Sequence, residues 1–178
     1  MELIKEIYDD AGTPYMDCTY RIRKASRAVV LNDRDEIALL FVTKGNYHKL
    51  PGGGIKSGET IYDALKREVE EEVGAFIEDI KELGITVEYR CNDSLLQMSY
   101  GYIAKATGEL KDPMFTDNEI DDGFVLRWVP IQIAIEILKQ DMPANDKGKF
   151  IQQRDVEFLL KATELIKQKT MLMVSVDF

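Results

Sequence analysis

The clearest hydrophobic pattern in the chain lies between residues 60 and 75. Apolar side chains recur there at every fourth position, at Ile61, Leu65, Val69 and Val73. Thr60 suits an N-cap, with Asp63 three residues further on, and Gly74 suits the left-handed position that follows a last helical turn. The pattern therefore predicts an amphipathic helix over residues 61–73, with its apolar stripe in a core.

Apolar runs elsewhere predict further strands and helices. The strands are Ala28–Leu31 and Ile37–Val42, which form a hairpin, then Ile77–Arg90 with a break near residues 82–84, Leu95–Ala106 and residues 123–129. The helices are Ile131–Lys139 and Phe150–Lys167. This alternation predicts an α/β fold with helices on both faces of a mixed sheet. Residues 1–20, with a turn at Gly12–Pro14, predict a short helix or strand, or an arm to a second subunit. The apolar, β-prone tail 171–176 packs on the domain or pairs with another chain.

Several single residues have two readings. Tyr47 is either a packed edge or a ring on which a nucleobase stacks, while Tyr100, Tyr102 and Trp128 are expected in the core. His48, the only histidine, is expected at the surface of a loop over residues 43–49. The basic segment 21–27 (RIRKASR) predicts a solvated strand edge, and its alternative reading is contact with a substrate phosphate or a neighbouring subunit.

The composition of the chain indicates how many domains to expect and which kinds of partner it can bind. A chain of 178 residues with 45% hydrophobic content suits one domain over residues 1–178. The net charge of −9 opposes binding to long nucleic acid, but not to a nucleotide whose phosphates meet a bound metal. Cys18 and Cys91 lack metal spacing and predict structural thiols in a reduced compartment. Without a signal peptide or a membrane-spanning run, the expected location is cytoplasmic, with no membrane partner.

Three carboxylates crowd one face of the predicted helix 61–73. Glu68, Glu71 and Glu72 stand at positions i, i+3 and i+4, where like charges repel. One reading is a solvated acidic face. The other is a site for Mg²⁺ or Mn²⁺, which take oxygen ligands and keep waters for substrate phosphates.

The residues around these carboxylates favour the second reading. From Gly53 to Ala75 the spacing is glycine, five residues, Glu59, seven residues, then REVEEEVGA from Arg67. This resembles the Nudix box, GX5EX7REUXEEXGU with U an aliphatic residue, of the Nudix hydrolase family. The resemblance implies an α/β/α sandwich around a mixed sheet. It also implies Glu68, Glu71, Glu72 and the Gly52 carbonyl as ligands of Mg²⁺ or Mn²⁺, with Glu59 and Arg67 as a supporting ion pair.

Other candidate residues lie outside the box helix. Within the acidic loop Gly108–Asp122, Glu119 is the candidate for an extra metal ligand or general base, ahead of Asp117 and Asp121, and a solvated carboxylate is the other reading. The base is otherwise one of the three box glutamates. Gly52 and Gly53 let backbone approach a ligand closely. Arg154, on the last helix, is a candidate for contact with a substrate phosphate.

The resemblance implies a Mg²⁺-dependent hydrolase acting on a small nucleotide-derived substrate. The leading hypothesis is cleavage of a phosphoanhydride bond in a nucleoside diphosphate linked to another group, as in ADP-ribose or a nucleotide sugar. One alternative is release of pyrophosphate from a damaged nucleoside triphosphate such as 8-oxo-dGTP. Another is a non-catalytic module that senses a nucleotide. A homodimer is left open.

Overall fold

The computed structural model describes residues 1–9 and 19–174. Within them one mixed sheet has the strand order β1-β5-β6-β2-β3-β4, and β7 pairs with β3. The strands are β1 (Leu3–Tyr8), β2 (Arg21–Leu31), β3 (Glu36–Val42), β4 (Tyr47–Lys49), β5 (Phe76–Arg90), β6 (Leu95–Thr107) and β7 (Phe124–Pro130). The β1–β5 and β2–β6 pairs are parallel, and the other pairs are antiparallel. The predicted mixed sheet is confirmed, whereas the break expected near residues 82–84 is only a register shift between Glu82 and Gly84 within a continuous β5.

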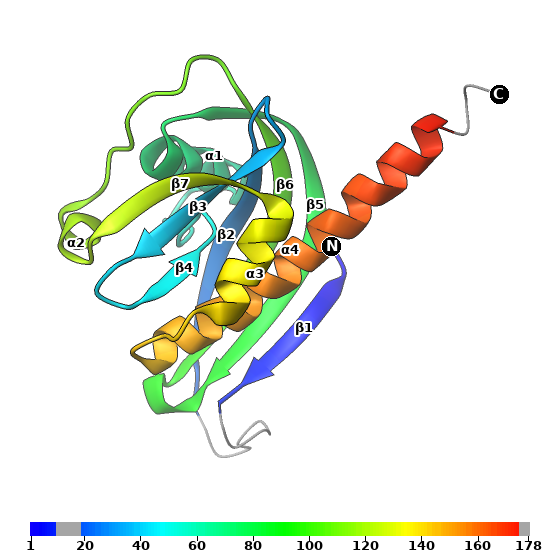
Figure 1. Cartoon of the computed structure of the whole chain (residues 1–178). Coiled ribbons are helices and arrows are strands. Elements are labelled where there is room, and N and C mark those ends of the chain that lie inside the picture. Colours follow the sequence, from blue (N-terminus) through cyan, green and yellow to red (C-terminus); the bar gives the residue numbers. More distant parts are fainter. Residues whose placement is uncertain (10–18, 175–178) are drawn as a thin grey trace.

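Helices cover both faces of this sheet (Figure 1). They are α1 (Ile61–Val73), α2 (Asp117–Asp121), α3 (Ile131–Gln140) and α4 (Asp146–Val174). Val29 and Val30 are neighbours on β2, so their side chains point to opposite faces. Val29 belongs to a buried cluster with α3 and α4, whereas Val30 belongs to one with α1. Burial on both faces explains the apolar runs of the central strands and confirms the α/β/α sandwich.

Helix α1 begins and ends where its sequence predicts. Thr60 accepts a hydrogen bond from the backbone of Asp63, whose carboxylate accepts one from the Thr60 backbone in return. Gly74 is left-handed, with φ of 69°. A Cβ at Gly74 would overlap with the carbonyl of Lys111, so both conformation and space favour glycine. These caps fix the carboxylate-bearing helix at both ends.

The basic segment 21–27 is not a solvated edge, so that prediction is wrong. Strand β2 begins at Arg21 rather than Ala28, and this segment pairs in parallel with residues 95–101 of β6. Arg27 is only 5% exposed. Four basic side chains thus lie on a central strand, and those that face inward need an environment that accepts charge.

Other boundaries also differ from the predictions. The strand over residues 3–8 is one of the elements expected there, whereas β4 lies within the segment 43–49 that was expected to be a loop. The acidic loop contains the short helix α2, because Thr116 and Glu119 form a capping box. Helix α4 starts at Asp146 and continues to Val174, so the tail is helical, not β, as far as that residue. The predicted turn at Gly12–Pro14 and the rest of the tail lie outside the described residues.

Burial confirms some single-residue predictions and corrects others. Tyr102 is buried in the α1 cluster, and Tyr100 and Trp128 pack against that cluster. His48 is buried in β4 rather than exposed, where its backbone N–H and its Nδ1 contact the Asp141 carboxylate at 2.6 and 2.9 Å. The imidazole ring of His48 stacks on the ring of Phe41 in β3.

Cysteine and membrane expectations have different outcomes. Cys91 is disulfide-bonded, so the expectation of a thiol there is wrong, while Cys18 lies outside the described residues. The disulfide removes one support for a reduced compartment. Among residues 1–9 and 19–174, no helix combines the length and the apolar content that crossing a membrane requires.

The packing of α4 on the sheet predicts different costs for two adjacent residues. Leu159 is fully buried in the cluster between α4 and the sheet, whereas Leu160 is 40% exposed. Leu159→Ala should lower the free energy of unfolding by about 2–5 kcal/mol, because it leaves a cavity. Leu160→Ala, the matched control, should cost less than about 1 kcal/mol. Denaturant unfolding measures both, and equal costs would contradict this orientation of α4.

Candidate functional site

A glycine loop lies directly on strand β2. The backbone N–H groups of Ser26 and Ala28 donate to the carbonyls of Gly53 and Pro51, at 3.0 and 2.9 Å. Gly52 has φ of +135°, and a Cβ there would overlap with the Ser26 carbonyl. Only glycine therefore allows the loop to lie this close to the strand.

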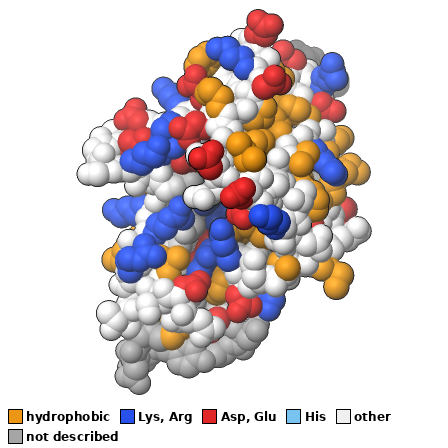
Figure 2. All heavy atoms as spheres, turned by 90° about the vertical axis from the view of Figure 1, so that its left-hand side faces the viewer, with side chains coloured by type: hydrophobic (Ala, Val, Ile, Leu, Met, Phe, Trp, Pro, Cys, Tyr) orange, Lys and Arg blue, Asp and Glu red, His pale blue; other side chains and the backbone are white. Residues whose placement is uncertain are grey.

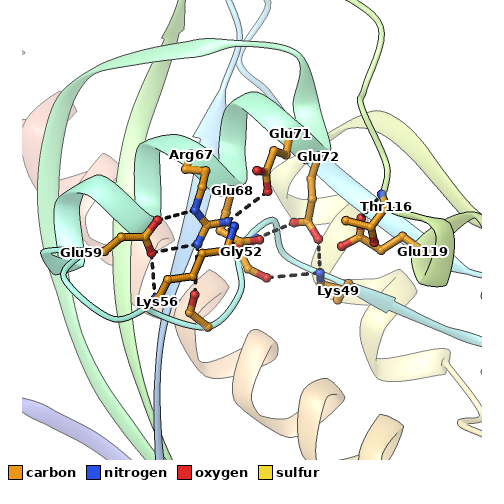
Figure 3. Close-up of polar contacts among 11 residues, drawn as sticks. Lys49, Gly52, Lys56, Glu59, Arg67, Glu68, Glu71, Glu72, Thr116 and Glu119 are labelled. Carbon is orange, nitrogen blue, oxygen red and sulfur yellow. Dashed lines mark hydrogen bonds and ion pairs between the residues drawn. The ribbon is translucent and has the colours of Figure 1, made fainter.

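Arg67 links this loop to the carboxylates of α1 (Figure 3). Its Nε and Nη2 donate to the two oxygens of Glu59, at 2.6 and 3.1 Å, and Nη2 also donates to the Gly54 carbonyl. Its Nη1 contacts Glu68 at 2.7 Å and Glu71 at 3.0 Å. The guanidinium lowers the pKa of Glu59 to about 2, so this carboxylate stays ionised at neutral pH. One planar group thus fixes two carboxylates of α1 relative to the loop.

Glu72 is held by a separate set of donors. Its Oε1 accepts from Lys49 Nζ at 2.5 Å, and its Oε2 accepts from the Gly52 backbone N–H at 2.6 Å. The same ammonium lies 3.3 Å from the Gly52 carbonyl. Burial raises the pKa of Glu72, and Lys49 opposes that rise. A cationic group therefore already lies between a carboxylate and a carbonyl that were predicted to bind a metal.

The box carboxylates suit a hard divalent cation chemically. They offer oxygen donors from adjacent turns of one helix, and Gly53 makes room for one of them, because a Cβ there would overlap with the Glu68 carboxylate. In the present arrangement Glu68 and Glu71 both accept from Arg67. Glu72 accepts from Lys49. Across the described part of the chain, no three or more His, Cys, Asp or Glu side chains are grouped closely enough to hold a metal ion.

A pocket of about 390 Å³ opens between the box and α2. Glu68, Glu72 and the glycine loop form one side, and Glu119 lies on the other. Glu119 also caps α2 by accepting from the Thr116 N–H at 2.8 Å. Asp117 and Asp121 are exposed on α2 and do not line the pocket. Of the three acidic-loop candidates, Glu119 is therefore the one that faces the box.

Tyr47 and Arg154 also line this pocket. Tyr47 is buried, packs with Val42 and Ile151, and has a pKa raised by burial. Arg154 is fully buried, and its guanidinium donates to Asp155 and Glu88. These two carboxylates already compensate the charge of Arg154. Contact between Arg154 and a substrate phosphate stays a prediction.

Other basic residues of the pocket were not single candidates from the sequence, although Arg23 and Arg27 lie in the segment 21–27, whose alternative reading was contact with a substrate phosphate. These other basic residues are Arg23, Arg27, Lys49, Arg90 and Lys147. Figure 2 shows Lys and Arg side chains gathered in the middle of one face of the molecule. Arg23 and Arg27 carried a signal, because their even spacing in a strand places them on the same side. Lys49 and Arg90 carried none, since only the fold brings their strands to the box.

Comparison with known proteins identifies the family to which the chain belongs. The NUDIX domain family model matches residues 21–153. The chain is 30% identical over 128 residues to an RNA pyrophosphohydrolase from Ruthia magnifica subsp. Calyptogena magnifica, covering 62% of this chain and 72% of that protein. It is 33% identical over 108 residues to the human 8-oxo-dGDP phosphatase NUDT18, covering 58% of this chain and only 31% of that protein.

Solved structures agree on the fold. A NUDIX hydrolase from Nitrosomonas europaea matches with a TM-score of 0.55 and 20% identity, covering 75% of this chain and 87% of that chain. The MutT NUDIX hydrolase from Burkholderia pseudomallei matches with a TM-score of 0.54 and 19% identity, covering 75% and 97%. The family model spans most of the chain, and it establishes that the protein belongs to the Nudix hydrolase family.

Proposed function

We propose that this Nudix pyrophosphohydrolase uses Mg²⁺ to cleave a phosphoanhydride bond in a nucleoside diphosphate linked to another group. The observation that carries the proposal is the pocket itself, where box carboxylates and a glycine loop face a group of basic side chains. Carboxylates suit a metal, and basic groups suit phosphates beyond the reach of that metal. A substrate with two or more phosphates would use both.

We propose Glu68, Glu71, Glu72 and the Gly52 carbonyl as the residues that hold the divalent ion. The position of Lys49 supports this, because its ammonium already contacts Glu72 and the Gly52 carbonyl. When bound, such an ion polarises phosphoryl oxygens and lowers the pKa of a bound water. Mn²⁺ shares these ligand preferences and is expected to replace Mg²⁺.

The other box residues orient the carboxylates. Arg67 bridges Glu59 to Glu68 and Glu71, so the pair Glu59 and Arg67 sets where those carboxylates lie. We propose that the general base is a box glutamate or Glu119, which lies across the pocket. Gly52, Gly53 and Tyr47 line the same pocket, so we propose that the glycine backbone lies beside the substrate phosphates and that the Tyr47 ring contacts the nucleobase.

A second candidate function is release of pyrophosphate from an oxidised nucleoside triphosphate. The human relative is named for an oxidised deoxynucleotide, 8-oxo-dGDP, and it aligns over 58% of this chain. The two candidates differ in the bond that breaks, so the products separate them. The first gives two phosphorylated products that share the original diphosphate, and the second gives pyrophosphate and a nucleoside monophosphate.

Product analysis over a panel of nucleotides tests the proposed reaction. The panel contains ADP-ribose, nucleotide sugars, dinucleotides, and ordinary and 8-oxo triphosphates, each incubated with Mg²⁺. We expect two phosphorylated products from a nucleoside diphosphate derivative, and no turnover when a chelator replaces Mg²⁺. Pyrophosphate from triphosphates alone would favour the second candidate. Turnover in the chelator would contradict the metal requirement.

Replacing Glu71 tests the role of the box carboxylates. Glu71→Gln removes one charge from a partly exposed side chain whose observed side-chain contact is with Arg67, so it should change the melting temperature little. We expect kcat to fall by at least about a hundredfold, because a divalent ion contributes several kcal/mol to the transition state. Glu70→Gln is the charge-matched control, because Glu70 is the neighbouring residue on the same helix but is not one of the three box glutamates proposed as ligands. If both variants keep wild-type kcat, the site is wrongly placed.

A further inference from the structure

Arg27 is a buried side chain that forms no ion pair with a carboxylate of the described residues. It is 5% exposed, it lines the pocket, and its Nε and Nη1 make no hydrogen bond within the described residues. Burying a charge without a partner costs several kcal/mol, which a protein does not usually accept without a reason. A ligand that supplies the missing acceptors is one such reason.

Nearby carboxylates are already engaged by other donors. Glu88 accepts from Arg90 and Arg154, and Asp155 accepts from Arg154 and from the Leu50 N–H. Glu72 accepts from Lys49 and Gly52. The carboxylates near Arg27 therefore accept hydrogen bonds from other groups and not from Arg27.

Arg23, four residues before Arg27 on strand β2, also forms no ion pair with a carboxylate of the described residues. Its observed hydrogen bond runs from Nη1 to Gln97 Oε1, a neutral acceptor, at 2.6 Å, and the described residues offer it no ion pair. Arg23 and Arg27 lie on the same side of β2, separated on that side only by the small side chain of Ala25. Gly54 leaves room for Arg23, since a Cβ there would lie 3.0 Å from its Nη2. Two guanidinium groups that form no ion pair within the described part of the chain thus line one wall of the pocket.

Both groups stay charged at neutral pH. Burial, followed by the nearby Arg154 charge, lowers the pKa of Arg27 to about 10. The same two causes lower the pKa of Arg23, which is less buried. An anion would relieve the repulsion between these cations as well as fill the empty donor positions.

We propose that Arg23 and Arg27 form a phosphate-binding subsite on the β2 wall of the pocket, separate from the box carboxylates. Guanidinium groups bind phosphate oxygens through two parallel N–H donors, and two adjacent groups suit a phosphate that carries more than one negative charge. The identity of the ligand, a phosphate of a nucleotide substrate or product, rests on the proposed function. The subsite holds a phosphate by charge and hydrogen bonding, without the metal.

Anion binding in the presence of a chelator tests the subsite without turnover. Pyrophosphate, orthophosphate and ADP are titrated into the full chain, and melting temperature and heat of binding are recorded. We expect pyrophosphate to stabilise the wild-type protein. Arg27→Met should weaken its binding at least tenfold, and should raise the melting temperature of the ligand-free protein, because an unpaired buried charge has gone. If ADP binds more tightly than orthophosphate, the ligand is a nucleotide phosphate. If ADP and orthophosphate bind equally, the ligand is a free phosphate.

Two further variants keep the test decisive. Arg21→Gln removes one charge from an exposed arginine on the same strand that does not line the pocket, and should change pyrophosphate affinity less than twofold. Arg23→Gln changes a less buried residue and serves if Arg27→Met does not fold; it should also weaken binding several-fold. Equal affinity in wild type, Arg23→Gln and Arg27→Met, or no pyrophosphate binding to the wild type, would overturn the subsite. Because no metal is present, either result leaves the test of Glu71 unaffected.

Discussion

The site depends on one guanidinium group, that of Arg67. It joins Glu59 and the Gly54 carbonyl, both from the loop before α1, to Glu68 and Glu71 on the helix itself. Without this cation, three carboxylates would face one another across a few ångströms, and their repulsion would separate the loop from the helix. Because the loop also rests on β2 through the carbonyls of Pro51 and Gly53, Arg67 connects helix α1 to the central sheet.

Charge in this protein is segregated. The chain carries a net charge of −9, yet its pocket has more basic than acidic side chains. Five of the basic groups that line the pocket fall into two sets. Lys49, Arg90 and Arg154 are compensated by carboxylates, and they position those carboxylates and the surrounding elements. Arg23 and Arg27 form no ion pair among residues 1–9 and 19–174, and they leave the pocket wall positive. An acidic exterior with a positive interior favours a small polyanion inside the pocket over an extended one on the surface.

The sequence predicted what local rules determine. Thr60 and Gly74 fix α1 by hydrogen bonding and a left-handed turn, both visible in a few residues. The spacing from Gly53 to Ala75 identified the family because it is a local motif. By contrast, the depth of β2 in the sheet depends on its pairing with β6, about seventy residues away, so the basic segment looked like an edge. Lys49 and His48 were missed or misplaced for the same reason, since only tertiary contacts with Glu72 and Asp141 bury them.

The central claim is that the box carboxylates bind a divalent cation in place of their present cationic partners. Titration with Mn²⁺, followed by the electron paramagnetic resonance signal of the free ion, tests it directly in the absence of substrate. The account predicts saturable binding to the wild-type protein, with affinity lowered at least about tenfold by Glu68→Gln and unchanged by Glu70→Gln. Equal Mn²⁺ affinity in all three proteins would contradict it.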